Sequence, residues 1–225
     1  MTSLLMPLAA HARLAHPQPA TGARPAPGAL TWFAQPPGRP TLRPVRADDA
    51  AAFQNFVMRL SPASRRMRFH GAVNSCSPAM LKALTQPDVA VHRAWVALAQ
   101  EGDAEVIVGE ARYAATAAAG EAELAIAVAD EHRGRGLADR LIDAVVGEAA
   151  RAEVPALFAD VLEGNGRMFG LLQRHGFEVH RSARVEAGLV RWRRRLPLAT
   201  AGSATARFAT ARSATDSSRW QPLAA

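Results

Sequence analysis

The stretch from Glu121 to Ala138, EAELAIAVADEHRGRGLA, constrains the fold of this chain more than any other. Its first half predicts a strand, because apolar side chains alternate onto one face: Leu124, Ile126 and Val128. Its second half is a turn rich in glycine and arginine, Arg133 to Gly136, which leads into an apolar-periodic helix. The first amides of a helix have no intrahelical partner and lie at the positive end of its dipole. A strand followed by such a turn and helix therefore predicts a site for an anion such as pyrophosphate.

Two other phosphate-binding motifs do not fit this turn. The dinucleotide fingerprint needs a third glycine, which is absent, and it follows the first strand of a βαβ unit, whereas the strand before Arg133 is expected to continue a meander. The P-loop needs a lysine after its glycines, and Lys82 is the only lysine in the chain.

The composition narrows the class of protein. With 225 residues and 49% hydrophobic content, the chain has room for one domain of ordinary size plus tails. The net charge of +7 comes almost wholly from arginine, which together with the abundant alanine favours a GC-rich genome over a nucleic-acid-binding surface. One cysteine excludes an intramolecular disulfide, and the scattered histidines predict no metal site. No apolar run approaches the roughly 20 residues of a membrane span, so we expect a cytoplasmic protein with no membrane partner.

The folded domain is expected over residues 41–196. Residues 1–40 are rich in proline, alanine and glycine without apolar periodicity, which predicts a disordered leader. Residues 197–225 lack periodicity as well and predict a disordered tail.

The apolar periodicity, helix caps and turn residues of this domain predict a mixed α/β (α+β) architecture. The expected strands cover residues 41–45, 91–98, 105–113, 121–128, 156–162, 177–180 and 188–196. The expected helices open at Asp48 or Asp49, at Ser61-Pro62, at Ser77-Pro78, at Leu137 and at Asn165. Strands 91–98, 105–113 and 121–128 should form an antiparallel meander, with its second turn at Ala117 to Gly120. The helix from Leu137 is a crossover, so strand 156–162 should run parallel to strand 121–128.

Spacing along these elements also predicts where side chains lie. Two helical faces are expected in the core: Phe53, Phe56, Val57 and Leu60, and then Leu137, Leu141, Ile142, Val145 and Val146. Met67 and Phe69 are expected there as well. Three arginines that alternate along the last strand are expected to form one solvated face: Arg191, Arg193 and Arg195.

Two motifs in these positions resemble the signatures of the GNAT superfamily of N-acetyltransferases. The acyl-CoA signature of that family is Gln or Arg, two residues, Gly, one residue, then Gly or Ala, and Arg133, Gly136 and Ala138 match it between a strand and a helix. The second signature is an Asn that opens a helix ending in Gly-Phe, matched by Asn165 and by Gly176-Phe177. The resemblance implies the GNAT fold, a mixed and mostly antiparallel central sheet flanked by helices, with a parallel strand pair splayed at the acyl-CoA site.

Within the superfamily the chain is similar to the acetyltransferase domain of bacterial Pat-type protein-lysine acetyltransferases. The similarity lies in the segment Leu60 to Phe69 and in Ala122 to Ala125. It implies an acetyl-CoA-dependent enzyme, without a metal, that acetylates a primary amine by direct attack, with protein lysine as one candidate acceptor. A small-molecule amine acetyltransferase and a non-catalytic acyl-CoA-binding module are the alternatives.

The resemblance also implies roles for individual residues. In Pat-type enzymes a glutamate on the strand before the glycine turn is the general base, and Glu123 occupies that position; the alternative is a solvated strand-end charge. Glu121, Glu110 and Asp160 are weaker candidates for the base. The residues implied for the cofactor are Ile126, Ala127 and Val128 for the pantetheine, Asn165 for the pantetheine or as a plain helix cap, and Arg133, Gly134, Arg135, Gly136, Leu137 and Ala138 for the pyrophosphate.

Many members of the family place a tyrosine, as the general acid for the leaving thiolate, where this chain has Leu172. Tyr113 is the only tyrosine in the chain, so we predict no tyrosine acid. Water or the departing ammonium can protonate the thiolate, because the pKa of a thiol is about 8.5.

Overall fold

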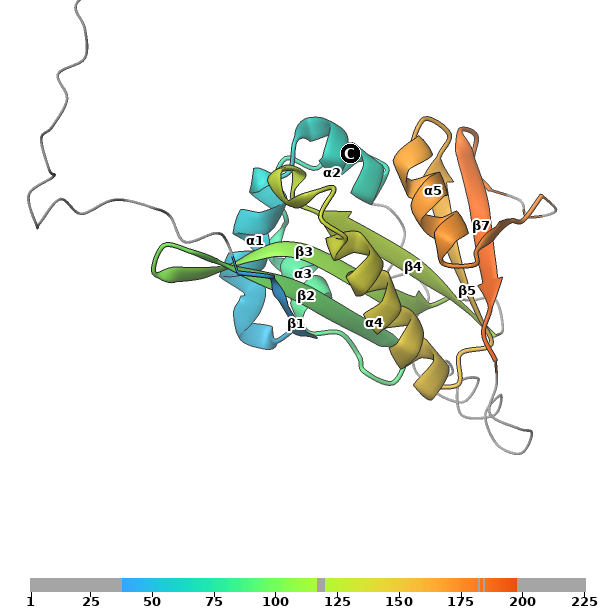
Figure 1. Cartoon of the computed structure of the whole chain (residues 1–225), viewed down its shortest axis with the longest axis horizontal. Helices are drawn as coiled ribbons and strands as arrows, with labels where there is room; N and C mark the ends of the chain where they lie inside the picture. The colour runs from blue at the N-terminus through green and yellow to red at the C-terminus, as the bar shows by residue number, and fades with distance from the viewer. Residues whose placement is uncertain (1–37, 117–119, 182, 184, 198–225) are drawn as a thin grey trace, which may run out of the picture. The chain divides into compact units, whose positions relative to one another are not determined.

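The computed structural model describes residues 38–116, 120–181, 183 and 185–197. Most of the predicted leader and tail, and most of the predicted turn at Ala117 to Gly120, lie outside these residues. The strands are β1 (Thr41–Pro44), β2 (His92–Glu101), β3 (Ala104–Ala115), β4 (Glu121–Val128), β5 (Ala156–Leu162), β6 (Glu178–Val179) and β7 (Leu189–Arg195) (Figure 1). The helices are α1 (Ala50–Arg59), α2 (Pro62–Phe69), α3 (Pro78–Thr85), α4 (Leu137–Arg151) and α5 (Gly166–Arg174), with short 3-10 turns η1 (Ala47–Asp49) and η2 (Asp130–His132).

The described strands form one seven-stranded sheet in the order β1-β2-β3-β4-β5-β7-β6. Strands β4 and β5 are parallel, as the crossover through α4 predicted, and the other neighbouring pairs are antiparallel. The last two strands form the predicted hairpin, and β7 lies between β5 and β6. The mixed, mostly antiparallel sheet expected from the sequence is confirmed.

The parallel pair is short, and this opens the sheet at its centre. Register between β4 and β5 runs only from Glu121 opposite Ala156 to Glu123 opposite Phe158. Strand β4 then stays paired with β3 as far as Val128 opposite Gly109, while β5 stays paired with β7. The two strands therefore diverge into a wedge, with α2 and α5 beside its open end (Figure 1).

Helices cover both faces of the sheet. Helix α4 packs on β2, β3 and β4 through Leu141, Ile142 and Val145, which are fully buried, as their spacing predicted. It lies so close that a Cβ added at Gly109 would be 3.0 Å from Leu141 Cδ1, so a larger residue at this point of β3 would require Leu141 to shift by a few tenths of an ångström. Helix α1 packs on β3 and buries its predicted core face: Phe53, Phe56, Val57 and Leu60.

The predicted Ser-Pro starts of α2 and α3 are confirmed, because Ser61 Oγ accepts from the Ser64 amide and Ser77 Oγ from the Met80 amide, each at 3.2 Å. Helix α1 follows Asp49 as expected, but the Asp49 carboxylate makes no cap hydrogen bond to it. That carboxylate instead forms an ion pair with Arg43 at 2.6 Å.

Two predictions about side chains are wrong. Met67 is 37% exposed rather than in the core, because it lies on the face of α2 that looks into the wedge. Phe69 packs against the core but is only partly buried. The arginines of β7 do not form a freely solvated face, since Arg191 and Arg193 are half-buried in ion pairs with acidic residues of β5 and β4.

No helix in the described part of the chain is long and apolar enough to cross a membrane.

Candidate active site

A cavity of about 740 Å³ fills the wedge between β4 and β5. Its walls come from α2, β4, the glycine turn, the start of α4, the end of β5 and the start of α5. The structure brings these predicted site residues together on its lining: Glu123, Ile126, Ala127, Val128, Arg133, Gly134, Gly136, Leu137, Ala138 and Asn165.

The glycine turn presents backbone donors to this cavity. Gly134 and Gly136 both have a φ of 71°, a left-handed conformation that other residues adopt only with strain. A Cβ built on either glycine meets nothing within 4 Å, so the space beside them is open. Within the described residues, no hydrogen bond occupies the amides of Gly134 to Asp139. The turn and the first turn of α4 thus leave a row of free backbone donors facing open space, a geometry that suits an anion.

A network of side chains holds the turn in place. The Arg133 guanidinium forms an ion pair with Asp130 at 2.6 Å and donates to Ser64 Oγ at 2.7 Å, and Ser64 donates in turn to Asp130 at 2.8 Å. Burial alone would raise the pKa of Asp130, but hydrogen bonds from Ser61 and Ser64 lower it overall. The side chain of Arg133 is therefore engaged within the protein. Sequence reasoning missed this link between α2 and the turn, although the Ser61-Pro62 cap located one end of it.

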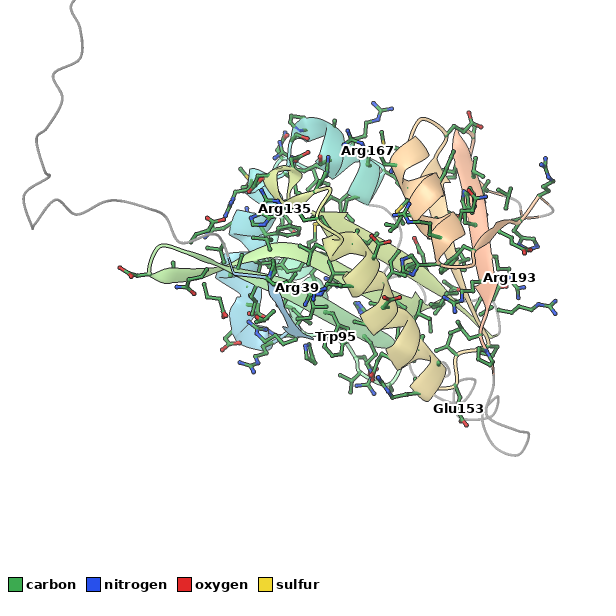
Figure 2. All side chains as sticks on the ribbon, in the orientation of Figure 1. Arg39, Trp95, Arg135, Glu153, Arg167 and Arg193 are labelled. Carbon is green, nitrogen blue, oxygen red and sulfur yellow. The ribbon has the colours of Figure 1, made fainter. Side chains whose placement is uncertain are left out.

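Arg135 is the one predicted cofactor residue that does not line the main cavity. It is exposed and borders a smaller cavity of about 130 Å³ together with Arg39 and Arg140. Figure 2 labels Arg135 and Arg39. Two exposed arginines of α5 line the mouth of the main cavity and were not singled out from the sequence, Arg167 and Arg174. In the sequence, only their position on the helix that follows Asn165 indicated that they could lie near the cavity.

The edge of β4 beside the cavity is free of β5, because the pairing between the two strands ends at Glu123. The Val128 carbonyl accepts from Arg133 Nε at 3.3 Å, so it points away from β3. Backbone groups of a strand alternate in direction, so Ile126 directs its amide and carbonyl to the same side. An extended group in the cavity can thus pair with β4 as an added strand would.

Glu123 lies on the cavity lining with its carboxylate unengaged. Its side chain is exposed to the cavity and makes no hydrogen bond or ion pair with any residue that the structure describes. Desolvation and the nearby Asp160 raise the pKa of Glu123, against the effect of Arg68 and Arg191, which lower it. A carboxylate with a raised pKa and no partner is suited to accept a proton.

The weaker candidates for the base are all held in ion pairs. Glu121 is bonded to Arg193 at 2.6 Å and Asp160 to Arg191 at 2.5 Å. Glu110 is fully buried between two arginines. Since a guanidinium neutralises each of these three carboxylates, Glu123 is the one of the four candidates without an ion-pair partner in the described part of the chain.

At the opposite wall, Asn165 caps α5: its Oδ1 accepts from the Met168 amide at 3.3 Å. The cap role considered for it is therefore observed, and its side-chain amide nitrogen has no partner in the described structure. Leu172, at the position of the family's tyrosine, is fully buried. Tyr113 is buried away from the cavity lining, and burial raises its pKa to about 12.

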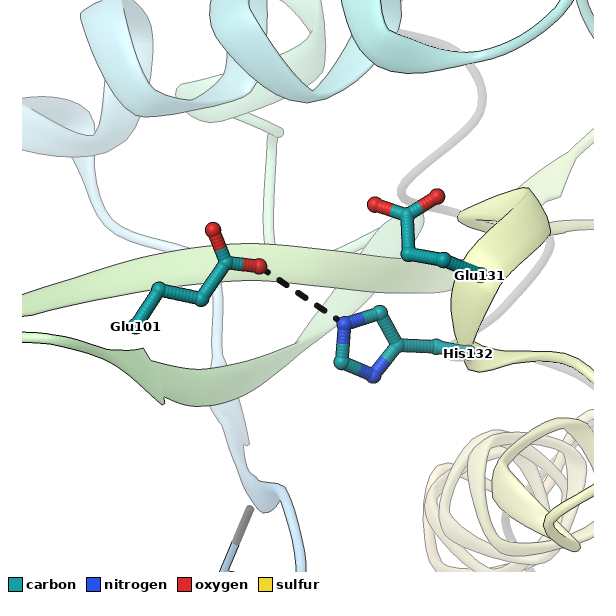
Figure 3. A group of neighbouring side chains, drawn as sticks. All are labelled: Glu101, Glu131 and His132. Carbon is teal, nitrogen blue, oxygen red and sulfur yellow. Dashed lines mark ion pairs between the residues drawn. The ribbon is translucent and has the colours of Figure 1, made fainter. Parts of the chain in front are cut away.

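At the edge of the cavity, which His132 lines, three potential metal ligands come close together: Glu101, Glu131 and His132 (Figure 3). His132 Nε2 lies 3.7 Å from Glu101 Oε1. The Arg59 guanidinium contacts Glu101 at 2.8 Å and Glu131 at 2.5 Å. The Arg59 guanidinium thus bridges the two carboxylates, and the group forms an exposed ion-pair cluster between α1, β2 and η2.

Comparison with known proteins places this arrangement in context. The family model for the acetyltransferase (GNAT) domain matches residues 39–178. A Pseudomonas aeruginosa protein named Acetyltransferase PA5475 is 35% identical over 136 residues, which cover 60% of this chain and 73% of that protein. The crystal structure of the GNAT domain of S. lividans PAT superposes with a TM-score of 0.62 at 28% identity, covering 70% of this chain and 90% of that chain.

A further similar structure is the GNAT superfamily phosphinothricin acetyltransferase of Sinorhizobium meliloti in complex with AcCoA. It superposes with a TM-score of 0.59 at 18% identity and covers 74% of this chain and 93% of that chain. At this identity the similarity supports the fold.

Proposed function

This chain belongs to the GNAT family of acetyltransferases, and on that premise we propose that it moves an acetyl group from acetyl-CoA to a primary amine by direct attack in a ternary complex. The observation that carries the proposal is the shared cavity: an unpaired carboxylate, Glu123, lies on the same lining as the open glycine turn. One site can therefore hold the acyl donor and activate the acceptor.

The donor side of the cavity fits coenzyme A. The free amides of Gly134 to Ala138 suit a pyrophosphate, and the open space beside Gly134 and Gly136 lets it approach. The unpaired edge of β4 over Ile126 to Val128 suits the amides of the pantetheine, and the side chain of Asn165 adds a donor from the facing helix. The S. meliloti relative solved with AcCoA shares the fold that builds these two walls.

The acceptor side supplies the base. An alkylammonium has a pKa of about 10.4, so the amine must lose a proton before it can attack. Glu123 accepts that proton directly or through water, and its raised pKa strengthens it as a base. The amine nitrogen then bonds to the thioester carbonyl carbon and the carbon–sulfur bond breaks. The thiolate takes up a proton from the substituted ammonium or from water, which yields an amide and free coenzyme A.

A lysine side chain of a protein is the acceptor that we favour. It rests on the similarity to Pat-type enzymes, including the 28% identity to the S. lividans PAT domain. A small-molecule amine is the second candidate, and a module that binds acyl-CoA without turnover is the third.

A thiol-release screen separates these candidates. Acetyl-CoA would be offered with lysine-containing proteins, polyamines and free amino acids, and release of coenzyme A measured. Turnover with proteins supports the favoured acceptor, and turnover with small amines alone supports the second. Tight acetyl-CoA binding by calorimetry without thiol release across the whole panel would support the non-catalytic module. Self-acetylation adds little to this readout, because the chain has one lysine.

A further inference from the structure

Arg68, near the end of α2, connects the cavity to a buried ion cluster. Its Nε donates to Glu110 Oε1 at 2.5 Å, and the other oxygen of Glu110 accepts from Arg112 Nε at 2.8 Å. The side chains of Arg68, Glu110 and Arg112 are 10%, 1% and 5% exposed. Two guanidinium groups thus share one carboxylate, and the triad carries one excess positive charge in a setting where water screens little.

The register of the sheet places the triad on the same face as Glu123. Glu110 lies opposite Ala127, Arg112 opposite Ala125, and Glu123 opposite Ala114. Residues opposite each other in an antiparallel pair share a face, so the triad and Glu123 lie on the same face of the sheet. The small side chains at 125 and 127 leave room between them, and Arg68 and Glu123 both line the cavity.

The other charged groups near Glu123 are already balanced. On β4 itself Glu121 is paired with Arg193, and across the wedge Asp160 of β5 is paired with Arg191 of β7. His70, which follows α2, has its pKa lowered by burial and by Arg68, so near neutral pH it is uncharged. Three charged groups act on Glu123: Arg68, Asp160 and Arg191. Since Asp160 and Arg191 are paired with each other, the charge of Arg68 and its triad is the one of these three that is not offset.

Resting on the proposed function, we propose that Arg68 is a positioning residue whose charge, fixed in place by Glu110, keeps the Glu123 carboxylate ionised. Desolvation in the cavity raises the pKa of Glu123 and the charge of Arg68 lowers it. Only the ionised carboxylate can accept a proton from the amine, so a nearby cation that favours this form supports the base. The charge of Arg68 thereby favours the ionised form of Glu123, which is the form that accepts a proton.

The test is a carbon-13 NMR titration of the Glu123 carboxyl, assigned by its loss in Glu123→Gln. In Arg68→Gln, which removes the charge and keeps a donor for Glu110, the apparent pKa of Glu123 should rise by about one unit. Arg66→Gln is the matched control, because Arg66 lies on the same helix but is exposed and outside the cavity lining, and it should leave that pKa unchanged. Equal titration curves for wild type and folded Arg68→Gln overturn the inference.

Glu110→Gln gives a second measurement of opposite sign. It adds a positive charge to the triad, so the Glu123 pKa should fall, and a folded variant without that fall also contradicts the inference. The acidic limb of the kcat/KM profile should move with the titration. If Arg68→Gln shifts the titration while Glu123→Gln keeps full turnover, the inference stands and the base assignment fails. If Glu123→Gln is inactive but neither cluster variant moves the titration, the assignment stands and the inference fails.

Discussion

His175 Nε2 lies 3.1 Å from Asp139 Oδ1, which ties the end of α5 to the first turn of α4. The other ring nitrogen, Nδ1, lies 3.2 Å from Asp143 Oδ1, one turn further along α4. Asp139 also accepts from Arg174, and both Asp139 and Arg174 line the cavity. Two walls of the proposed donor site are therefore joined by one imidazole.

This contact predicts a pH dependence of stability. Burial alone would raise the pKa of Asp139, but hydrogen bonds from His175 and Arg174 lower it overall. A carboxyl with a folded-state pKa below its unfolded value stabilises the fold above the unfolded pKa, and that contribution is lost as the pH falls through the folded pKa. Asp139→Asn should therefore lose less stability than wild type between pH 7 and pH ~3.5, measured by urea unfolding. Asp103→Asn, in the exposed β2–β3 turn, is the control and should follow wild type. Equal losses in Asp139→Asn and wild type would contradict this prediction.

Replacing the proposed base should separate catalysis from binding. Glu123→Gln is expected to lower kcat by roughly 10²–10⁴-fold, because the amide cannot accept the proton of the ammonium. The acetyl-CoA dissociation constant, measured by calorimetry, should stay within about twofold, since the residues proposed for coenzyme A are untouched. Glu178→Gln changes the same charge on exposed strand β6 and should leave both constants unchanged. Wild-type turnover in Glu123→Gln would refute the base assignment.

Two glycine substitutions should separate the effect of backbone strain on stability from the effect of an added Cβ on acetyl-CoA binding. Gly136→Ala places a Cβ at a φ of 71° and in the open space beside the free amides, so it should cost about 1–2 kcal/mol of stability and weaken acetyl-CoA binding. Gly102→Ala, at a φ of 59° in the β2–β3 turn, carries the same strain away from the cavity. Its stability should fall by a similar amount with unchanged acetyl-CoA affinity. A Gly136→Ala variant that binds acetyl-CoA like wild type argues against a pyrophosphate on this turn.

The link between α2 and the glycine turn should matter for both folding and binding. Ser64→Ala removes the hydroxyl that joins Asp130 to Arg133, at a cost of about 2 kcal/mol since both partners are charged. The loosened turn should also raise the dissociation constant of acetyl-CoA. Ser77→Ala removes a helix cap in α3 for about 1 kcal/mol and should leave that constant unchanged. Stability is measured by thermal melts and acetyl-CoA affinity by calorimetry on both variants. Identical acetyl-CoA affinities of Ser64→Ala and Ser77→Ala would show that the Ser64 network does not contribute to binding.

Much of the secondary structure could be predicted because its causes are local. The Ser61-Pro62 and Ser77-Pro78 caps act on amides three residues away, and the periodicity of Leu141, Ile142 and Val145 repeats within two turns of α4. The prediction that Met67 is buried failed, because helical spacing predicts an apolar face but not whether another element covers that face. In this fold the wedge between β4 and β5 leaves that face open.

By itself, the sequence determined the order of the elements, the helix caps, and the glycine turn between a strand and a helix. These depend on residues a few positions apart, whose backbone preferences and hydrogen bonds do not need the rest of the chain. The partners of the charged side chains come from the fold: Arg68 binds Glu110, 42 residues away, and Arg133 binds Ser64, 69 residues away. Such contacts depend on strand register and on where β4 separates from β5. The same register leaves Glu123 without a partner in the described structure, which no local pattern could determine.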